Sequence, residues 1–221
     1  MKKMEIVQLT DANLPECITK AVEVLQRGGV ILCPTDTLYG LGVDALSSAA
    51  VDVLYKIKGR EEGKPIHCMV SDLNMAERYA QFDFRARTIA KEFLPGPLTI
   101  ILKKHPTFDT GITRDITTIG IRIPNADFCL EIEKMFRKPV TTTSANLSGK
   151  PCERTIEQIL LQLGDAAREI DLVIDAGELP ESLPSTVVDL SDEDPIILRE
   201  GVIPSADIWQ VLGPVIGNLG I

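Results

Sequence analysis

The sequence predicts an α/β fold with a mixed sheet, and two observations support this prediction. Short apolar runs alternate with helical patterns over the first two thirds of the chain, whereas strands and turns dominate the last third. A length of 221 residues, 44% of them hydrophobic, suits one sizeable core and is short for two full domains. We therefore expect a single domain, 1–221, with a core over about 14–203 and a C-terminal helix and tail over 204–221.

The helices are predicted from apolar residues at helical spacing. Over 14–27, Ile18, Val22 and Leu25 share one face, and Pro15 suits the first turn. The same criteria predict helices at 48–58, 73–80, 85–93, 126–136 and 155–163. Short apolar or alternating runs predict strands at 30–33, 66–70, 98–102, 119–123, 140–143, 172–174, 186–190 and 196–198.

Composition narrows the class of protein. The net charge of −9 argues against a surface that grips nucleic acid by counterion release. The five cysteines form no CxxC pair and there are only two histidines, so no zinc spacing exists and we expect reduced, mostly buried thiols. No signal-peptide core and no apolar run of about 18 residues is present, so we expect a cytoplasmic protein with no membrane segment.

The stretch PTDTLYGLG, 34–42, follows a predicted buried strand with hydroxyls, a carboxylate and glycines. Open α/β folds place ligands in loops at strand ends, so we expect this loop to contribute to a site. An ordinary strand-to-turn junction, with Gly40 and Gly42 at positive φ, is the alternative.

Two further segments predict an anion site. Four cations fall within KIKGREEGKP, 56–65, of an otherwise acidic chain, although cations at a helix C-terminus would give the same pattern. TTTSANLSG, 141–149, supplies many hydroxyl and amide groups after a strand, although turn bonding is an ordinary use of such residues. No Walker A sequence is present, so side chains would have to hold the phosphates.

Arg122 lies on the alternating strand 119–123, on the same face as Gly120. A guanidinium beside a bare glycine can approach a planar carboxylate in a bidentate manner. A solvated strand face is the alternative for this arginine.

Taken in order and spacing, PTDTLYGLG, KxKGR with a following KP, PGPLT, GIRIP, TSANLSG, the late Ser-Thr pair and LREG resemble the YrdC-like family of threonylcarbamoyl-AMP synthases of the TsaC type. The resemblance covers about 14–203 and fits the single-domain form. It implies a twisted, open mixed sheet with flanking helices around a large concave cavity. It also implies condensation of L-threonine, bicarbonate and ATP, with Mg²⁺, into threonylcarbamoyl-adenylate and pyrophosphate. The product would reach tRNA through downstream transferase proteins.

The same resemblance implies roles for individual residues. Lys58 and Arg60 would be catalytic, and no protein ligand to a metal is implied. Two positions depart from the pattern: Met69 stands where some relatives have a histidine, with His67 two residues earlier, and Cys152 stands where some have a serine. Threonine would be held by Thr37, Arg122, Thr142 and Ser185, and ATP by Lys58, Arg60, Lys64, Thr118, Ser144, Cys152 and Arg199.

Two other functions compete with this one. A YciO-like sibling shares the fold and the VVDL and REG pattern, and would have a different nucleotide- or RNA-related role. Intact PTDTLYGLG and TSANLSG favour the synthase. An RNA-binding module without catalysis is disfavoured by the charge of −9.

Arg60→Ala tests whether the cation cluster acts on phosphate. We expect it to remove about 2–5 kcal/mol of transition-state stabilisation while folding is intact, because a guanidinium in a partly dehydrated cavity would be lost. The measurement is kcat/KM for adenylate formation, with circular dichroism as the folding control. Wild-type turnover in the folded variant would assign the cluster to the helix end alone.

Overall fold

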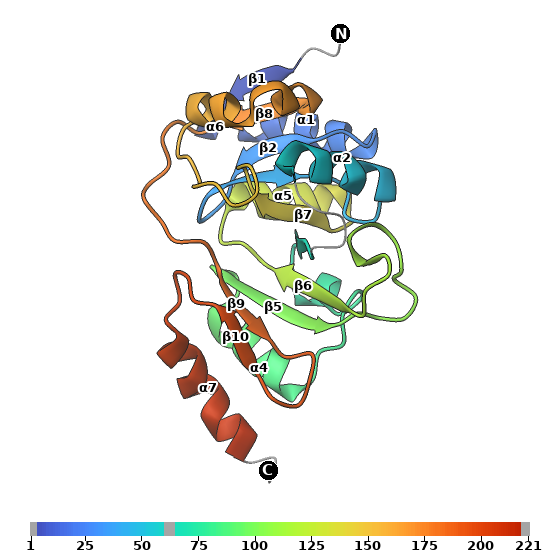
Figure 1. Ribbon diagram of the computed structural model, residues 1–221, viewed down its shortest axis with the longest axis vertical. Helices are drawn as coiled ribbons and strands as arrows, with labels where there is room; N and C mark the ends of the chain where they lie inside the picture. Colours follow the sequence, from blue (N-terminus) through green and yellow to red (C-terminus); the bar gives the residue numbers. More distant parts are fainter. Residues whose placement is uncertain (1–3, 60–64, 218–221) are drawn as a thin grey trace.

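A single ten-stranded mixed sheet runs through the protein. The computed structural model describes residues 4–59 and 65–217 (Figure 1). The strand order is β1-β8-β2-β3-β7-β4-β6-β5-β9-β10, with parallel pairs such as β2–β8 and β5–β9 and antiparallel pairs such as β2–β3 and β5–β6. The predicted α/β class with a mixed, open sheet is confirmed.

The elements alternate along the chain as the sequence indicated. The strands are β1 Glu5–Gln8, β2 Ile31–Pro34, β3 Tyr39–Gly42, β4 His67–Met69, β5 Leu98–Lys103, β6 Thr118–Arg122, β7 Val140–Ser144, β8 Leu172–Asp175, β9 Thr186–Asp189 and β10 Ile196–Arg199. The α-helices are α1 Leu14–Gln26, α2 Ser48–Lys58, α3 Leu73–Ala76, α4 Phe84–Phe93, α5 Asp127–Phe136, α6 Ile156–Leu163 and α7 Ser205–Gly217. Short 3-10 turns cover Asp11–Asn13, Gly111–Thr113 and Gly164–Glu169.

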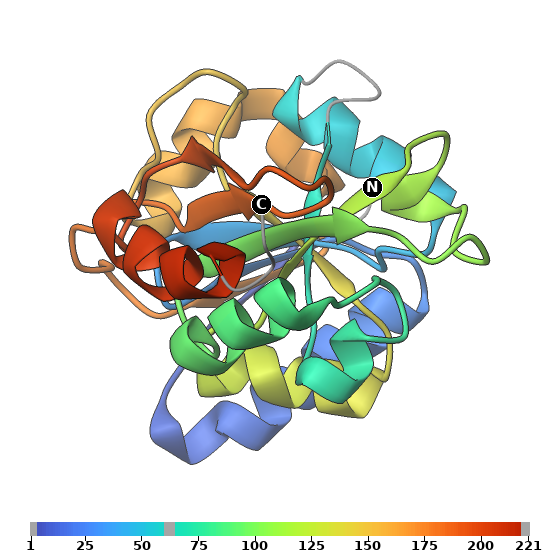
Figure 2. The ribbon, with the colours of Figure 1, turned by 90° about the horizontal axis from the view of Figure 1, so that it is seen from below.

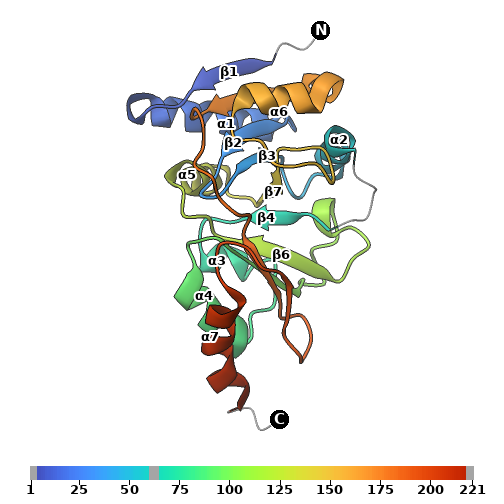
Figure 3. The ribbon, with the colours of Figure 1, turned by 60° about the vertical axis from the view of Figure 1, so that its left-hand side comes forward.

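Helices cover both faces of the sheet, which explains why strands such as β2 are buried on both faces. In β2, Leu32 belongs to one buried cluster together with Leu54 of α2, whereas Ile31 belongs to a second cluster with residues of α1 and α5. Seen from below, α2 and α6 lie on one side of the sheet and α1 and α5 on the other (Figure 2). At the far end of the molecule from β1, α7 packs beside α4 (Figure 3).

Strand β7 joins the two halves of the sheet. Its Thr143 and Ser144 pair with β3, whereas 140–142 pair with β4. The polar segment that follows β7 therefore leaves the sheet at its centre.

The structure differs from the predicted elements at three places. Residues 39–42, expected as a ligand loop, form the fully buried strand β3, and the predicted helix 73–80 ends at Ala76. Strand β1, which pairs in parallel with β8, was not predicted, because only two of its four residues are apolar. At Gly42, a Cβ would lie 3.0 Å from Ile31 Cγ1 and 3.1 Å from Val140 Cγ1, so this glycine lets β3 pack tightly between its neighbours and does not serve a turn.

Glu133 of α5 is an ionisable group inside the core. It is 0% exposed, and neither carboxylate oxygen has a hydrogen-bond partner among the described residues. Burial raises the pKa of Glu133 well above its ordinary value; Cys129 adds to this, and the charge of Arg122 opposes it. The folded state therefore favours the protonated acid.

Glu133→Gln is expected to stabilise the protein more as pH rises. Since the pKa of Glu133 is raised on folding, the wild-type free energy of unfolding falls as pH increases above the ordinary value of 4.5. Glutamine is neutral at every pH, so the variant lacks this pH-dependent loss of stability. Urea unfolding from pH 5 to 8 measures the difference, with the exposed Glu92→Gln as control. Parallel curves for wild type and Glu133→Gln would contradict a buried neutral acid.

Candidate functional site

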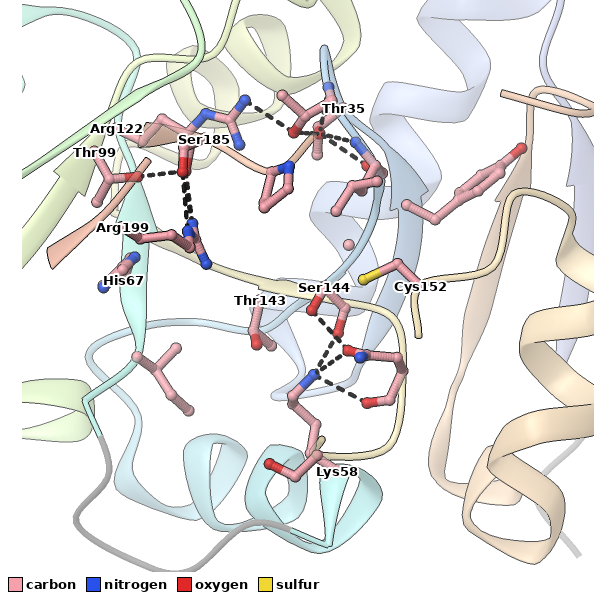
Figure 4. Close-up of a pocket in the computed structure, with 18 of the residues that line it drawn as sticks. Thr35, Lys58, His67, Thr99, Arg122, Thr143, Ser144, Cys152, Ser185 and Arg199 are labelled. Carbon is pink, nitrogen blue, oxygen red and sulfur yellow. Dashed lines mark hydrogen bonds between the residues drawn. The ribbon is translucent and has the colours of Figure 1, made fainter. Parts of the chain in front are cut away.

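A cavity of about 290 Å³ opens where the two halves of the sheet meet (Figure 4). Its walls come from the loop after β2, the end of α2, strands β4 to β7, the loop after β7 and the segment that leads into β9 and β10. Elements from nearly the whole chain thus converge on one space. Of the predicted site residues, those that line it are Thr37, Lys58, Arg122, Ser144, Cys152, Ser185 and Arg199.

The remaining predicted residues stand apart from this set. Arg60 and Lys64 lie outside the described residues. Thr118 begins β6 and is not among the described residues that line the cavity. Thr143, which follows Thr142, does line it. For Thr142 the structure describes the backbone alone, which pairs with His67 across β4 and β7.

Arg122 reaches the cavity from the end of β6, and the residue is 4% exposed. Its Nη2 donates to Asp36 Oδ1 at 2.6 Å and to Thr37 Oγ1 at 3.0 Å. Its Nε is buried without a partner among the described residues. The guanidinium is therefore anchored at one nitrogen and retains donor capacity at the others.

The loop after β2 is shaped by a threonine that the sequence analysis did not single out. Thr35 Oγ1 donates to the Leu38 carbonyl at 2.8 Å and accepts from the Thr37 and Leu38 amides, each at 3.2 Å. This hydroxyl closes a tight turn. The turn presents the Thr37 hydroxyl to Arg122.

A second polar group lies on the opposite half of the sheet. Ser185 Oγ and Thr99 Oγ1 are 2.9 Å apart and both residues are buried. Arg199 donates to the Ser185 carbonyl through Nε at 3.0 Å and Nη2 at 2.8 Å, and to Ser185 Oγ at 3.1 Å. Although Arg199 is exposed as a residue, desolvation of its guanidinium and the nearby Arg122 charge lower its pKa.

Lys58, the last residue of α2, holds the loop after β7. The side chain is buried, and its Nζ donates to Asn146 O and Asn146 Oδ1, each at 3.0 Å, and to the Ser144 carbonyl. Ser144 Oγ donates to the same Asn146 Oδ1 at 2.6 Å. The ammonium therefore fixes the position of Ser144 and adds positive charge to that wall.

The structure distinguishes His67 from Met69. His67 lines the cavity, whereas Met69 is 4% exposed and belongs to the buried cluster with α1 and α5. A Cβ at Gly120 would lie 2.4 Å from His67 Cδ2. The room beside Arg122 on β6, which the sequence analysis attributed to an incoming carboxylate, is therefore filled by the His67 ring.

Comparison with known proteins shows which family shares this sequence and fold. The profile of the Sua5, YciO and YrdC family, described as "Telomere recombination", matches residues 23–201. The chain belongs to this family. The family predicted from the sequence motifs is thereby confirmed.

Among relatives of the Sua5/YciO/YrdC family, a putative threonylcarbamoyl-AMP synthase of Methanocaldococcus jannaschii is 41% identical over 206 residues, covering 91% of this chain and 95% of that protein. Pyrococcus abyssi Sua5 complexed with L-threonine has a TM-score of 0.85 at 30% identity, covering 96% of this chain and 61% of the other. Escherichia coli YciO has a TM-score of 0.79 at 29% identity, covering 92% and 98%. The chain spans 57% and 64% of the curated P. abyssi and Bacillus subtilis synthases.

Other polar residues of this family member's cavity escaped the sequence analysis. Thr99 was assigned to a structural turn, and Tyr39 and Asn146 were seen only as parts of motifs. Burial raises the pKa of Tyr39 to about 12, and its hydroxyl donates to the Gly177 carbonyl at 2.8 Å while accepting from the Ala176 amide. These three residues hold the walls of the cavity in place. The sequence carried one local signal for them: side chains alternate along a strand, so the position of Thr99 in the predicted strand 98–102 could have indicated the face on which it lies.

Gly120→Ala tests the packing of His67 on β6. The added methyl must displace the ring, so we expect a loss of about 1–3 kcal/mol in stability. In the His67→Ala background the same change should cost almost nothing. Urea unfolding of the four proteins in this cycle measures the coupling.

Gly213→Ala on α7 is the control for Gly120→Ala, because a Cβ there meets no atom within 4 Å. It should leave stability unchanged or raise it by up to about 1 kcal/mol. Equal losses from Gly120→Ala in both backgrounds would show that the ring is not what the glycine accommodates.

Proposed function

We propose that this chain condenses L-threonine, bicarbonate and ATP into threonylcarbamoyl-adenylate and pyrophosphate. The observation that carries the proposal is one cavity with two guanidiniums, Arg122 and Arg199, set among hydroxyls that come from both halves of the sheet. The family relatives named as threonylcarbamoyl-AMP synthases support it. So does the P. abyssi relative that is complexed with L-threonine.

The amino acid would bind between two sets of hydroxyl side chains, one on each wall of the cavity. Arg122 offers a positive charge to an α-carboxylate, and Thr37 lies beside it at 3.0 Å. The paired hydroxyls of Thr99 and Ser185 supply a donor and an acceptor opposite. These groups match the carboxylate and hydroxyl of threonine, and Thr142 remains part of the proposal.

The nucleotide would bind toward Arg199 and the loop after β7. Arg199 is held at Ser185, and Ser144 is held by Lys58 and Asn146. Cys152 lines the same wall. Lys58 reaches a phosphate only by exchanging one of its present acceptors, so its charge acts first on the loop. Arg60, Lys64 and Thr118 remain assigned to ATP by motif.

The chemistry needs charge stabilisation and positioning rather than a protein nucleophile. The threonine amine and bicarbonate give a carbamate, whose oxygen attacks the α-phosphorus while the bond to pyrophosphate breaks. Negative charge grows on the phosphoryl oxygens and the leaving group, where fixed cations such as Arg199 act best. Mg²⁺ would enter as MgATP, held by the phosphates, since no cluster of three or more His, Cys, Asp or Glu side chains that could hold a metal occurs among the described residues.

The product would pass to downstream transferase proteins that modify tRNA. We place this step in the cytoplasm, where ATP, threonine and tRNA occur together. Within the described part of the chain, no helix is long and apolar enough to cross a membrane.

The decisive experiment follows label from threonine and from bicarbonate. Both labels should enter one adenylate, with one pyrophosphate released for each, when ATP and Mg²⁺ are present. Omitting bicarbonate is the control. The similarity to E. coli YciO keeps the sibling function as the alternative. Nucleotide binding by the folded protein without adenylate or pyrophosphate would favour that sibling.

Arg122→Lys is expected to weaken threonine use by about tenfold or more. Lysine keeps the charge but replaces the planar guanidinium, with donors on three nitrogens, by one tetrahedral ammonium, so both the anchor to Asp36 and Thr37 and the approach to a carboxylate change. Calorimetric titration of threonine at fixed ATP measures the effect. Unchanged affinity in the folded variant would remove Arg122 from the threonine site.

A further inference from the structure

Asp36 is the buried counter-ion of Arg122, and nothing above assigns it a role. The two side chains are 9% and 5% exposed, and Asp36 Oδ1 accepts from Arg122 Nη2 at 2.6 Å. Asp36 Oδ2 accepts from the Asn125 amide at 3.0 Å. One carboxylate thus ties the loop after β2 to both the end of β6 and the chain that follows it.

The arrangement restricts how Arg122 can meet a ligand. A guanidinium binds a carboxylate in a bidentate manner either through Nε and Nη2 or through Nη1 and Nη2, so Nη2 belongs to both edges. Nη2 carries two hydrogens, and its two hydrogen bonds are to Asp36 and Thr37. While both contacts last, an incoming carboxylate meets Arg122 through one nitrogen. The bidentate approach expected from the sequence is closed in this arrangement.

We propose that Asp36 is a positioning residue, which holds the Arg122 guanidinium at the angle that threonine requires. The inference rests on the proposed function, because it takes threonine as the ligand. Asp36 does not itself line the cavity, and its second oxygen is fixed by a main-chain amide. It acts through Arg122 rather than on the substrate.

The alternative role for such a carboxylate is that of an internal competitor. In that case Asp36 would leave Arg122 when the ligand carboxylate arrives, and its removal would tighten binding. If Asp36 left Arg122, its buried carboxylate would lose its cation while Oδ2 still accepted the hydrogen bond from the Asn125 amide. A buried carboxylate without a cation is costly, which favours the positioning role. The two roles predict opposite signs for the same substitution.

The chain offers a matched control for Asp36→Asn. Asp44 is also buried, with Oδ1 accepting from the Leu46 amide at 2.9 Å and Oδ2 from Lys138 Nζ at 2.8 Å. It therefore carries the same pair of contacts, one main-chain amide and one cation, away from the cavity lining. Asp44→Asn removes the same two kinds of contact without touching Arg122; its cation, Lys138, is half-exposed, so the variant controls for loss of the carboxylate and not for an unpaired buried arginine.

The test compares three forms of the 221-residue chain: wild type, Asp36→Asn and Asp44→Asn. We expect Asp36→Asn to weaken calorimetric threonine binding by at least about tenfold, to raise KM for threonine more than it lowers kcat, and to leave ATP binding within about twofold. Asp44→Asn should leave threonine binding unchanged. Threonine binding that is tighter in Asp36→Asn, or unchanged, would overturn the proposal.

Nitrogen-15 spectra of the arginine side chains give a readout that does not depend on the substrate. The Arg122 signals should shift in Asp36→Asn and keep their wild-type positions in Asp44→Asn; unshifted Arg122 signals in Asp36→Asn would overturn the positioning role. If wild type binds no threonine, the proposed substrate fails. The Arg122 signals then still decide whether Asp36 holds the guanidinium.

Discussion

The site depends on strand β7 pairing with β3 along its last two residues and with β4 along its first three. This split pairing joins the two halves of the sheet, and residues from both halves line the cavity. It also directs the Ser144 to Asn146 loop toward the end of α2, where Lys58 caps it. Gly42 of β3 permits the close packing of this strand against Ile31 of β2 and Val140 of β7.

The cavity keeps cations together in a chain whose net charge is −9. Each described cation is balanced differently: Arg122 by a buried carboxylate, Lys58 by carbonyl and amide oxygens, and Arg199 by Ser185. The pairing of Arg122 with Asp36 neutralises a charge. The printed contacts of Arg199 are to the Ser185 carbonyl and hydroxyl, which are dipoles, so an arriving polyanion can still interact with the charge of this guanidinium. The lowered pKa of Arg199 reflects its desolvation and its repulsion from Arg122, and an anion placed between the two guanidiniums would relieve that repulsion.

Sequence reasoning reached the mixed sheet through local patterns, and it reached the family and seven of the cavity residues through motifs that resemble that family. Strand ends followed by hydroxyls found Thr37 and Ser144, and the activity expected from the motifs agrees with the one in the relatives' names. The sequence-based predictions were wrong or incomplete where contacts between distant segments determine the structure. A buried YGLG strand looks like a glycine-rich loop, since only one of its partner strands, β2, is near in sequence and the other, β7, is about 100 residues away. The role of Gly120 could not be inferred without knowing that His67 lies over it.

Recognition of threonine, under the proposed function, rests on hydroxyls more than on a carboxylate clamp. With Nη2 of Arg122 already engaged, the carboxylate receives a single charged contact, and any α-amino acid would receive the same one. The hydroxyls of Thr37, Thr99 and Ser185 are buried and already have partners in the cavity wall, so a ligand hydroxyl would add hydrogen bonds to their remaining donor or acceptor capacity. 2-Aminobutyrate lacks that hydroxyl, so under the proposed function we expect it to bind less tightly than threonine. Serine keeps the hydroxyl and lacks one methyl, which is worth only about 1–3 kcal/mol, so discrimination against serine has to come from how closely the walls of the cavity pack around that methyl.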